Sequence, residues 1–197
     1  MCIISSFLMP YLNSAFFFEV DMGKFLTAHT RIEQLNTPEK WKLLDNQLYK
    51  DDDGTIYLCP RNYITDGFTI PKTLQIVAGG KMEYDTRASS QHDFECSYHK
   101  VIVINMSEQK LRLKRFLHVV NGTDVCENIP IEFLTIKDTT FRQTNDRFMR
   151  MLESVNNIPK WRKFLIGNAV NLNVSWMLSR HELDINRLYE VDYGLLK

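Results

Sequence analysis

The chain has 197 residues and balances 24 Lys and Arg residues against 24 Asp and Glu residues. This neutral balance excludes the global electrostatic footprint expected when nucleic acid or an anionic membrane is the main partner. A hydrophobic fraction of 44% and an aromatic fraction of 12% exclude a disordered or low-complexity chain. The length indicates a single domain with its own core.

Four cysteines, at positions 2, 59, 96 and 126, lie far apart without a CxxC pair. This spacing argues against a zinc ribbon or a redox pair and favours reduced thiols in a cytosolic assembly environment.

Residues 1–21 form an apolar N-terminal arm. The stretch "MCIISSFLMPYLNSAFFF" has no Lys or Arg before its apolar run and contains Pro10 and Asn13, so it fits neither a signal peptide nor a membrane span. Three interpretations stay open. Met22 is the natural start, the arm packs into the core of its own domain, or it docks on a neighbouring subunit. In the last case its interface side chains include Phe16, Phe17 and Phe18.

Local patterns predict the elements in chain order. Residues 41–49 and 55–60 flank the turn-forming run 51–54, which ends in Gly54, and this predicts a β-hairpin. Residues 37–41 can instead open a helix, with Thr37 as its cap and Pro38 as its first residue. Residues 61–71 read as extended chain, because Pro71 disfavours helix at the residue before it.

Residues 85–99 read as a helix capped by Asp85 or Thr86. Residues 100–120 alternate β-branched residues around a polar turn and predict a second hairpin, followed by a loop at 121–130. Residues 138–157 form an amphipathic helix, and another begins after Pro159. The apolar positions of these two helices are expected in the core: Phe141, Phe148, Met151, Leu152, Val155, Trp161, Leu165, Val170 and Leu172. The chain is therefore predicted to be an α+β domain of short antiparallel hairpins packed on about three helices.

His92 and Asp93 are adjacent in the middle of the helix predicted at residues 85–99. Arg142 and Asp146 lie four residues apart and therefore on one face of the later helix. If the two helices pack together and the bend delivers Asp66, an imidazole and several carboxylates meet in one cluster. We expect this cluster to be either a catalytic or metal centre or a purely structural network. In the structural case His92 bridges the helices and Arg142 neutralises Asp93.

Two other chemistries have weaker support. His92, Cys96 and His99 fall near one helical face, but a zinc site would lack a fourth ligand. The basic runs at residues 110–115 and 160–163 are more typical of solvated faces than of a specific nucleic-acid site. The sequence contains neither a glycine-rich phosphate loop nor a Ser-His-Asp signature, which leaves nucleotide hydrolysis and serine esterase chemistry without support.

The order TDGFTIP at residues 65–71, His-Asp at 92–93 and R-x-x-x-D-x-F at 142–148 resembles a family of unknown function found mainly in bacteriophages and prophages. The resemblance runs from about residue 41 to residue 176. The matching positions are Pro60, Tyr63, Thr65, Asp66, Ile70, Pro71, His92, Asp93, Arg142 and Asp146. The chain departs from the pattern at Thr69, at Asn145, after His-Asp, and in a hairpin insertion at about 100–138. Residues 22–197 are thus expected to form one domain that carries this inserted hairpin.

A second similarity is one of layout alone. Secretory and viral phospholipases use a glycine-rich calcium loop, a helix with His-Asp and a second helix that supplies another Asp. By this analogy His92 would activate water, Asp146 would orient it, and Asp93 with Asp66 and loop carbonyls would hold Ca²⁺. The family resemblance implies a virion-associated protein, a neck or tail component with other virion proteins as partners. Such a protein would form oligomers within an assembly and occupy the virion or, during assembly, the host cytoplasm. The alternative is a calcium-type metal-dependent hydrolase that acts on envelope lipid or cell wall during entry.

Overall fold

The computed structural model describes residues 23–27, 31–37, 40–66, 86–104, 117–120, 123–126, 129–155, 158–170 and 181–189. The predicted N-terminal arm with its three consecutive phenylalanines, the bend residues after Asp66 and the basic run at 110–115 lie outside these described residues. So does Leu172, one of the expected core positions.

The central sheet has five antiparallel strands in the order β1-β4-β5-β7-β10. Their bounds are Lys24–Phe25 for β1, Gln47–Lys50 for β4, Ile56–Cys59 for β5, Lys100–Ile104 for β7 and Leu134–Asp138 for β10. A smaller antiparallel sheet joins β2 (Ile32–Gln34), β3 (Trp41–Leu43) and β6 (Ile64–Thr65). A separate hairpin pairs β8 (Leu117–Val120) with β9 (Thr123–Cys126).

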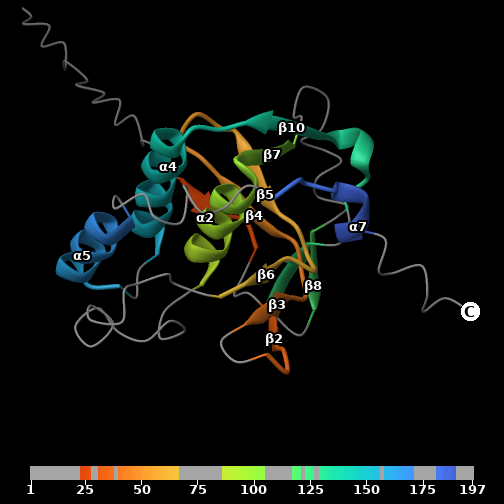
Figure 1. Ribbon diagram of the computed structural model, residues 1–197, viewed down its shortest axis with the longest axis horizontal. Helices are drawn as coiled ribbons and strands as arrows, with labels where there is room; N and C mark the ends of the chain where they lie inside the picture. Colours follow the sequence, from red (N-terminus) through yellow and green to blue (C-terminus); the bar gives the residue numbers. More distant parts are fainter. Residues whose placement is uncertain are drawn as a thin grey trace, which may run out of the picture.

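Helices α2 (Arg87–Tyr98) and α4 (Phe141–Ser154) pack against each other beside the central sheet, as Figure 1 shows. Helix α5 (Lys160–Val170) lies against α4, and the short helix α7 (Ile185–Tyr189) lies toward the opposite end of the molecule. A single 3₁₀ turn, η1 (Ile131–Phe133), leads into β10. This is a single mixed α+β domain, and the predicted fold class is confirmed. Within the described residues, none of the helices is long and apolar enough to cross a bilayer.

The first predicted hairpin is confirmed, because β4 and β5 pair around residues 51–54. The Thr55 carbonyl accepts the Asp51 N–H at 2.8 Å, and Asp51 in turn accepts the Gly54 N–H at 2.9 Å. Gly54 has φ 83°, a conformation that costs little for glycine and much more for a residue with a Cβ. Turn chemistry that is local in sequence therefore fixes this part of the sheet.

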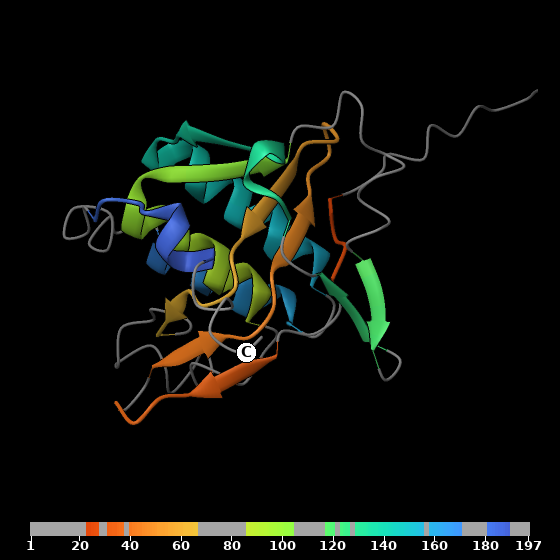
Figure 2. The ribbon, with the colours of Figure 1, turned by 90° about the vertical axis from the view of Figure 1, so that its right-hand side faces the viewer.

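The second predicted hairpin is wrong in its pairing. Strand β7 pairs with β5 and β10, so the two ends of residues 100–138 meet in the central sheet. The predicted loop at 121–130 contains β9, which forms its own hairpin with β8 (Figure 2). The helix considered at residues 37–41 is also wrong, because Trp41 begins β3. The alternation of residues 100–104 predicts a strand, but no local pattern indicates that β5 and β10 are its partners.

The core contains two clusters of buried apolar side chains. Leu48, Leu58 and Ile102 are paired in register across three strands and pack with Phe94 of α2. Tyr49 points the other way and joins the apolar side of α4 and α5. The buried members of this side include Phe148, Met151, Leu152, Val155 and Ile166.

Helix α4 lies within the predicted helix at residues 138–157 and is three residues shorter at each end. Thr140 and Gln143 form a capping box at its start, with the Gln143 N–H donating to Thr140 Oγ1 at 3.3 Å. The core position expected for Trp161 is wrong, because this residue is 51% exposed on α5.

We predict that Gly54→Ala lowers the free energy of unfolding by about 1–2 kcal/mol, because alanine is strained at φ 83° although no atom lies within 4 Å of the added Cβ. Gly54→Asn is the matched control and should lose less, since asparagine tolerates this conformation better. Urea unfolding measures both. Equal losses for the two variants would contradict the backbone explanation.

Candidate functional site: a polar centre between α2 and α4

Helix α2 is unusual in burying polar residues along most of its length. Its buried residues are Ala88, Ser89, Ser90, Gln91, His92, Phe94, Glu95 and Cys96. A buried polar side chain is costly unless it is hydrogen-bonded. The position of α2 therefore depends on partners supplied by the neighbouring elements.

His92 bridges the two helices. Its Nε2–H donates to Asn145 Oδ1 of α4 at 3.1 Å, and its ring centroid lies 4.5 Å from that of Phe148. Cys96 Sγ lies 3.5 Å from the same ring nitrogen. The side chain is nearly sealed, and the whole residue is 7% exposed. Burial lowers the His92 pKa to about 4, so the imidazole is neutral at pH 7.

One turn further along α2, Glu95 forms a buried ion pair with Arg147 of α4. Arg147 Nη1 donates to Glu95 Oε2 at 2.6 Å, and the two side chains are 7% and 0% exposed. Gln91 Nε2 donates to the other carboxylate oxygen at 2.9 Å. The Arg147 guanidinium carbon also lies 4.2 Å from the Tyr57 ring centroid, which connects α4 to β5. Burial raises the Glu95 pKa, while the charge of Arg147 opposes that rise.

Asp93 faces a different neighbour. Thr65 Oγ1 of β6 donates to Asp93 Oδ2 at 2.7 Å, which connects α2 to the smaller sheet. Asp66 follows Thr65 directly and is half-buried, so the chain delivers the start of the bend to the Asp93 side of α2. In the part of the chain that the structure describes, no three His, Cys, Asp or Glu side chains gather as a metal site.

Asp146 is turned away from this centre. Its side chain is 62% exposed and pairs with Arg142, itself 92% exposed, at 3.8 Å between Nε and Oδ2. Residues 145 and 146 point about 100° apart on a helix, so presenting Asn145 to His92 directs Asp146 to solvent. The packing of the two predicted helices is confirmed, but the single cluster that includes Asp146 and Arg142 is wrong.

The structural version of the prediction is partly right. His92 does bridge the helices, but Arg142 pairs with Asp146 instead of neutralising Asp93. The zinc alternative required His92, Cys96 and His99 on one helical face. His99 does not meet this requirement, because it is the C-cap of α2 and adopts φ 53°. Cys59 and Cys96 are both free and buried, and burial raises the pKa of each thiol.

A second ion pair holds α4 to the hairpin turn. Arg150 donates to both carboxylate oxygens of Asp51 at 2.7 Å. Burial would raise the Asp51 pKa, but the hydrogen bonds and charge of Arg150 outweigh it and the pKa is lowered. Sequence reasoning missed Arg147, Arg150, Glu95 and Asn145. The phase of α4 contained the signal for two of them, because Asn145 and Arg147 lie three and four residues before Phe148 and Met151, which are buried.

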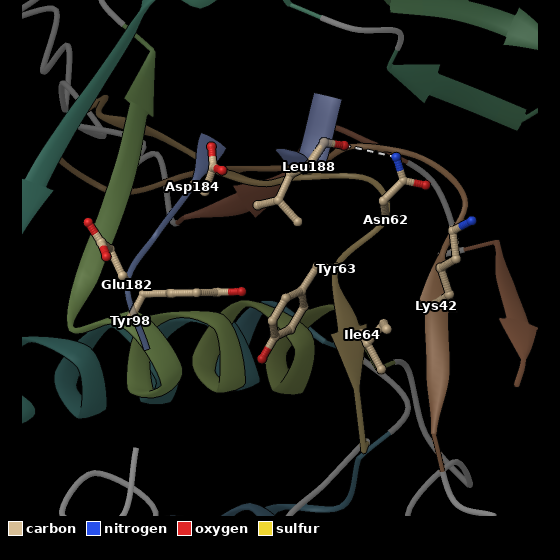
Figure 3. Close-up of a pocket in the computed structure, with 8 residues that line it drawn as sticks. All are labelled: Lys42, Asn62, Tyr63, Ile64, Tyr98, Glu182, Asp184 and Leu188. Atoms are coloured by element: carbon tan, nitrogen blue, oxygen red, sulfur yellow. Dashed lines mark hydrogen bonds between the residues drawn. The ribbon is translucent and has the colours of Figure 1, made fainter. Parts of the chain in front are cut away.

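The polar centre does not line the cleft shown in Figure 3. That cleft has a volume of about 420 Å³ and lies between β3, β6, the end of α2 and the α7 region. Tyr63 and Tyr98 form part of its wall, and the Asn62 side chain donates to the Leu188 carbonyl at 2.8 Å across it. His92, Asp93 and Asp146 are not among its lining residues. The cleft and the predicted catalytic residues are therefore separate features.

Comparisons of the chain with protein-family models, with curated protein sequences and with solved structures found no match.

We predict opposite outcomes for two neighbouring substitutions on α4. Asn145→Ala leaves the buried His92 N–H without its acceptor and should lower the free energy of unfolding by about 1–3 kcal/mol. Asp146→Ala removes only an exposed ion pair and should change it by less than about 0.5 kcal/mol. Chemical denaturation of both variants tests the orientation of α4. A larger loss for Asp146→Ala would contradict it.

We also predict a specific acid sensitivity. The His92 pKa is 6.5 in a model peptide and about 4 in the folded chain, so the unfolded chain binds the extra proton between these values. Stability should therefore fall as pH drops from 6.5 to 4, by up to about 3 kcal/mol from this residue. His92→Gln removes the titration, while Glu95 titrates in both proteins. The difference in unfolding free energy between wild type and His92→Gln should shrink on acidification, and a difference independent of pH would refute the assignment.

Proposed function

We propose that the chain is a virion-associated structural protein of a bacteriophage, a component of the neck or tail, in which the polar centre is part of the scaffold. The observation that supports the scaffold role is the His92 contact. The neutral imidazole donates a hydrogen bond to Asn145 and packs against Phe148, so its contacts are with the protein interior. A general base must instead reach the proton that it removes from substrate or water.

The phage setting rests on the order of residues. Thr65, Asp66, the His92–Asp93 pair and the R-x-x-x-D spacing on α4 follow the resemblance described above. The structure gives several of these residues mechanical roles. Thr65 and Asp93 connect the small sheet to α2, and His92 connects α2 to α4. A set of residues that joins three elements is suited to a protein that must keep its shape within an assembly.

The expected partners are other virion proteins, with several copies of the chain in one particle. The chain would be found in the virion and, before assembly is complete, in the host cytoplasm. The arm that contains Phe16, Phe17 and Phe18 remains the proposed contact with a neighbouring subunit, and it lies outside the described residues.

The hydrolase alternative requires His92 and Asp146 to act on the same water and Asp66 with Asp93 to hold Ca²⁺. The exposed position of Asp146 and the Asn145 contact of His92 weigh against the first requirement. The second requirement is open to a direct measurement with added calcium.

Particles purified from a lysate of the strain that encodes the chain provide the test. We predict that the chain copurifies with particles at a fixed ratio to the other virion proteins, measured by mass spectrometry, and that cryo-EM locates it in the neck or tail. Asp146→Asn should leave infectivity unchanged, whereas Asn145→Ala should reduce incorporation because it weakens the α2–α4 contact. Absence of the chain from particles would overturn the structural role.

Purified wild type and Asp146→Asn, each with and without Ca²⁺, distinguish the scaffold from the hydrolase. If the chain is a calcium-dependent hydrolase, Ca²⁺ should raise its melting temperature, and Asp146→Asn should abolish ester or cell-wall hydrolysis without loss of fold. For a scaffold, neither Ca²⁺ nor Asp146→Asn should change the melting temperature appreciably.

A further inference from the structure

The cleft of Figure 3 has walls that are anchored to each other at two points. The segment that carries α7 begins at His181, whose N–H donates to the Ser97 carbonyl of α2 at 3.0 Å. Further along, the Leu188 carbonyl accepts the Asn62 side chain at 2.8 Å, as Figure 3 shows. The segment is thus held against α2 at one end and against the residues that precede β6 at the other. The cleft is therefore formed by the fold itself.

Two tyrosine rings form one wall of this cleft. The Tyr63 ring centroid lies 5.3 Å from that of Phe94, edge to face, and 6.2 Å from that of Tyr98. The Tyr63 hydroxyl shares a hydrogen bond with Ser97 Oγ at 3.2 Å. Because core packing and a hydrogen bond fix Tyr63, the wall can receive an apolar group without first reorganising.

The cleft also leaves aliphatic surface open to a ligand. Ile64 lines it and is 46% exposed, and Leu188 lines it and is half-buried. A ligand with an apolar body would remove this surface from water. The volume of about 420 Å³ lies in the range of small-molecule sites.

Opposite charges stand on opposite sides of the cleft. Lys42 comes from β3 and Glu182 from the segment before α7, and Figure 3 shows the tyrosine rings and Leu188 between them. Glu182 is exposed and Lys42 is half-buried. Among the residues that the structure describes, neither of these two side chains takes part in a hydrogen bond or an ion pair. Both charges are therefore available to a ligand.

We propose that the cleft binds a small zwitterion with an apolar body, the chemistry shared by an apolar amino acid and a short apolar peptide. Its ammonium group pairs with Glu182 and its carboxylate with Lys42. Its apolar part lies against the tyrosine rings and Ile64. This inference goes beyond the proposed virion role, because the cleft is separate from the polar centre between α2 and α4.

Ligands of a single charge fit this arrangement less well. A phosphate or another anion would meet Lys42 but would be repelled by the carboxylates of Glu182 and Asp184, which line the same cleft. A simple amine would pair with Glu182 but would leave Lys42 without a counter-charge. Only a ligand that carries both charges satisfies both sides.

Isothermal titration calorimetry of the full chain with the dipeptide Leu-Phe tests the proposal. We expect N-acetyl-Leu-Phe, which lacks the ammonium group, and Leu-Phe amide, which lacks the carboxylate, each to bind about two- to fivefold more weakly than Leu-Phe. Titration with free phenylalanine distinguishes the two sources of this chemistry. Tighter binding of phenylalanine assigns the cleft to amino acids, and tighter binding of Leu-Phe assigns it to peptides.

Two variants assign the charges to their ends of the ligand. Glu182→Gln should weaken binding of Leu-Phe about two- to fivefold and leave binding of its N-acetyl form unchanged. Lys42→Met should weaken Leu-Phe to the same degree and leave the amide form unchanged. Glu132→Gln and Lys137→Met neutralise exposed charges outside the cleft, so these matched controls should bind Leu-Phe as wild type does.

Three results would overturn the proposal. They are no binding of Leu-Phe or phenylalanine to wild type, equal binding of Leu-Phe and its N-acetyl form, and an equal loss in the control variants. Circular dichroism measures whether each variant keeps its fold. The comparison of the blocked dipeptides needs only the wild-type chain and therefore decides the proposal even if a variant fails to fold.

Discussion

The buried ion pair between Glu95 and Arg147 is the constraint on which the arrangement of helices depends. Each charge is sealed from water, so removing either partner would leave the other unpaired in the interior. Arg147 also covers the Tyr57 ring, and Arg150 one turn later holds Asp51 at the hairpin turn. The position of α4 along its axis and its rotation are thereby set against both α2 and the sheet.

That rotation decides the chemistry available to His92. With Arg147 directed at Glu95, the residue two positions earlier meets the imidazole, and this residue is the amide Asn145. The Asn145 amide accepts the hydrogen bond of the imidazole without adding a charge beside it. Burial lowers the His92 pKa and keeps the ring neutral. A carboxylate at the same place would instead have favoured the imidazolium. The difference between a scaffold and an acid–base pair thus depends on which of two adjacent α4 residues faces inward.

Sequence reasoning succeeded where the signal was local. The hairpin around Gly54 and the amphipathic helix α4 follow from turn chemistry and apolar spacing. It failed for β7 and β10, whose paired residues lie 30 (Leu134 and Ile104) to 38 (Asp138 and Lys100) positions apart with no local signature. For the site, the two helices and their contact could be predicted. The rotation of α4 was mispredicted, because it was inferred from the polar residues Arg142 and Asp146 instead of from the apolar side of the helix. The apolar side of α4 determines its phase, and that phase places Asp146 in solvent.

Helix α2 passes into the central sheet through a single residue. His99, with φ 53°, ends the helix by donating its N–H to the Glu95 carbonyl, and Lys100 already belongs to β7. The His99 carbonyl accepts the Thr139 N–H that follows β10, so the joint is itself bonded to the neighbouring strand. At this end of α2, the described chain contains no loop that could act as a hinge. Any tilt of this helix must therefore also move β7, which is hydrogen-bonded to a strand on each side.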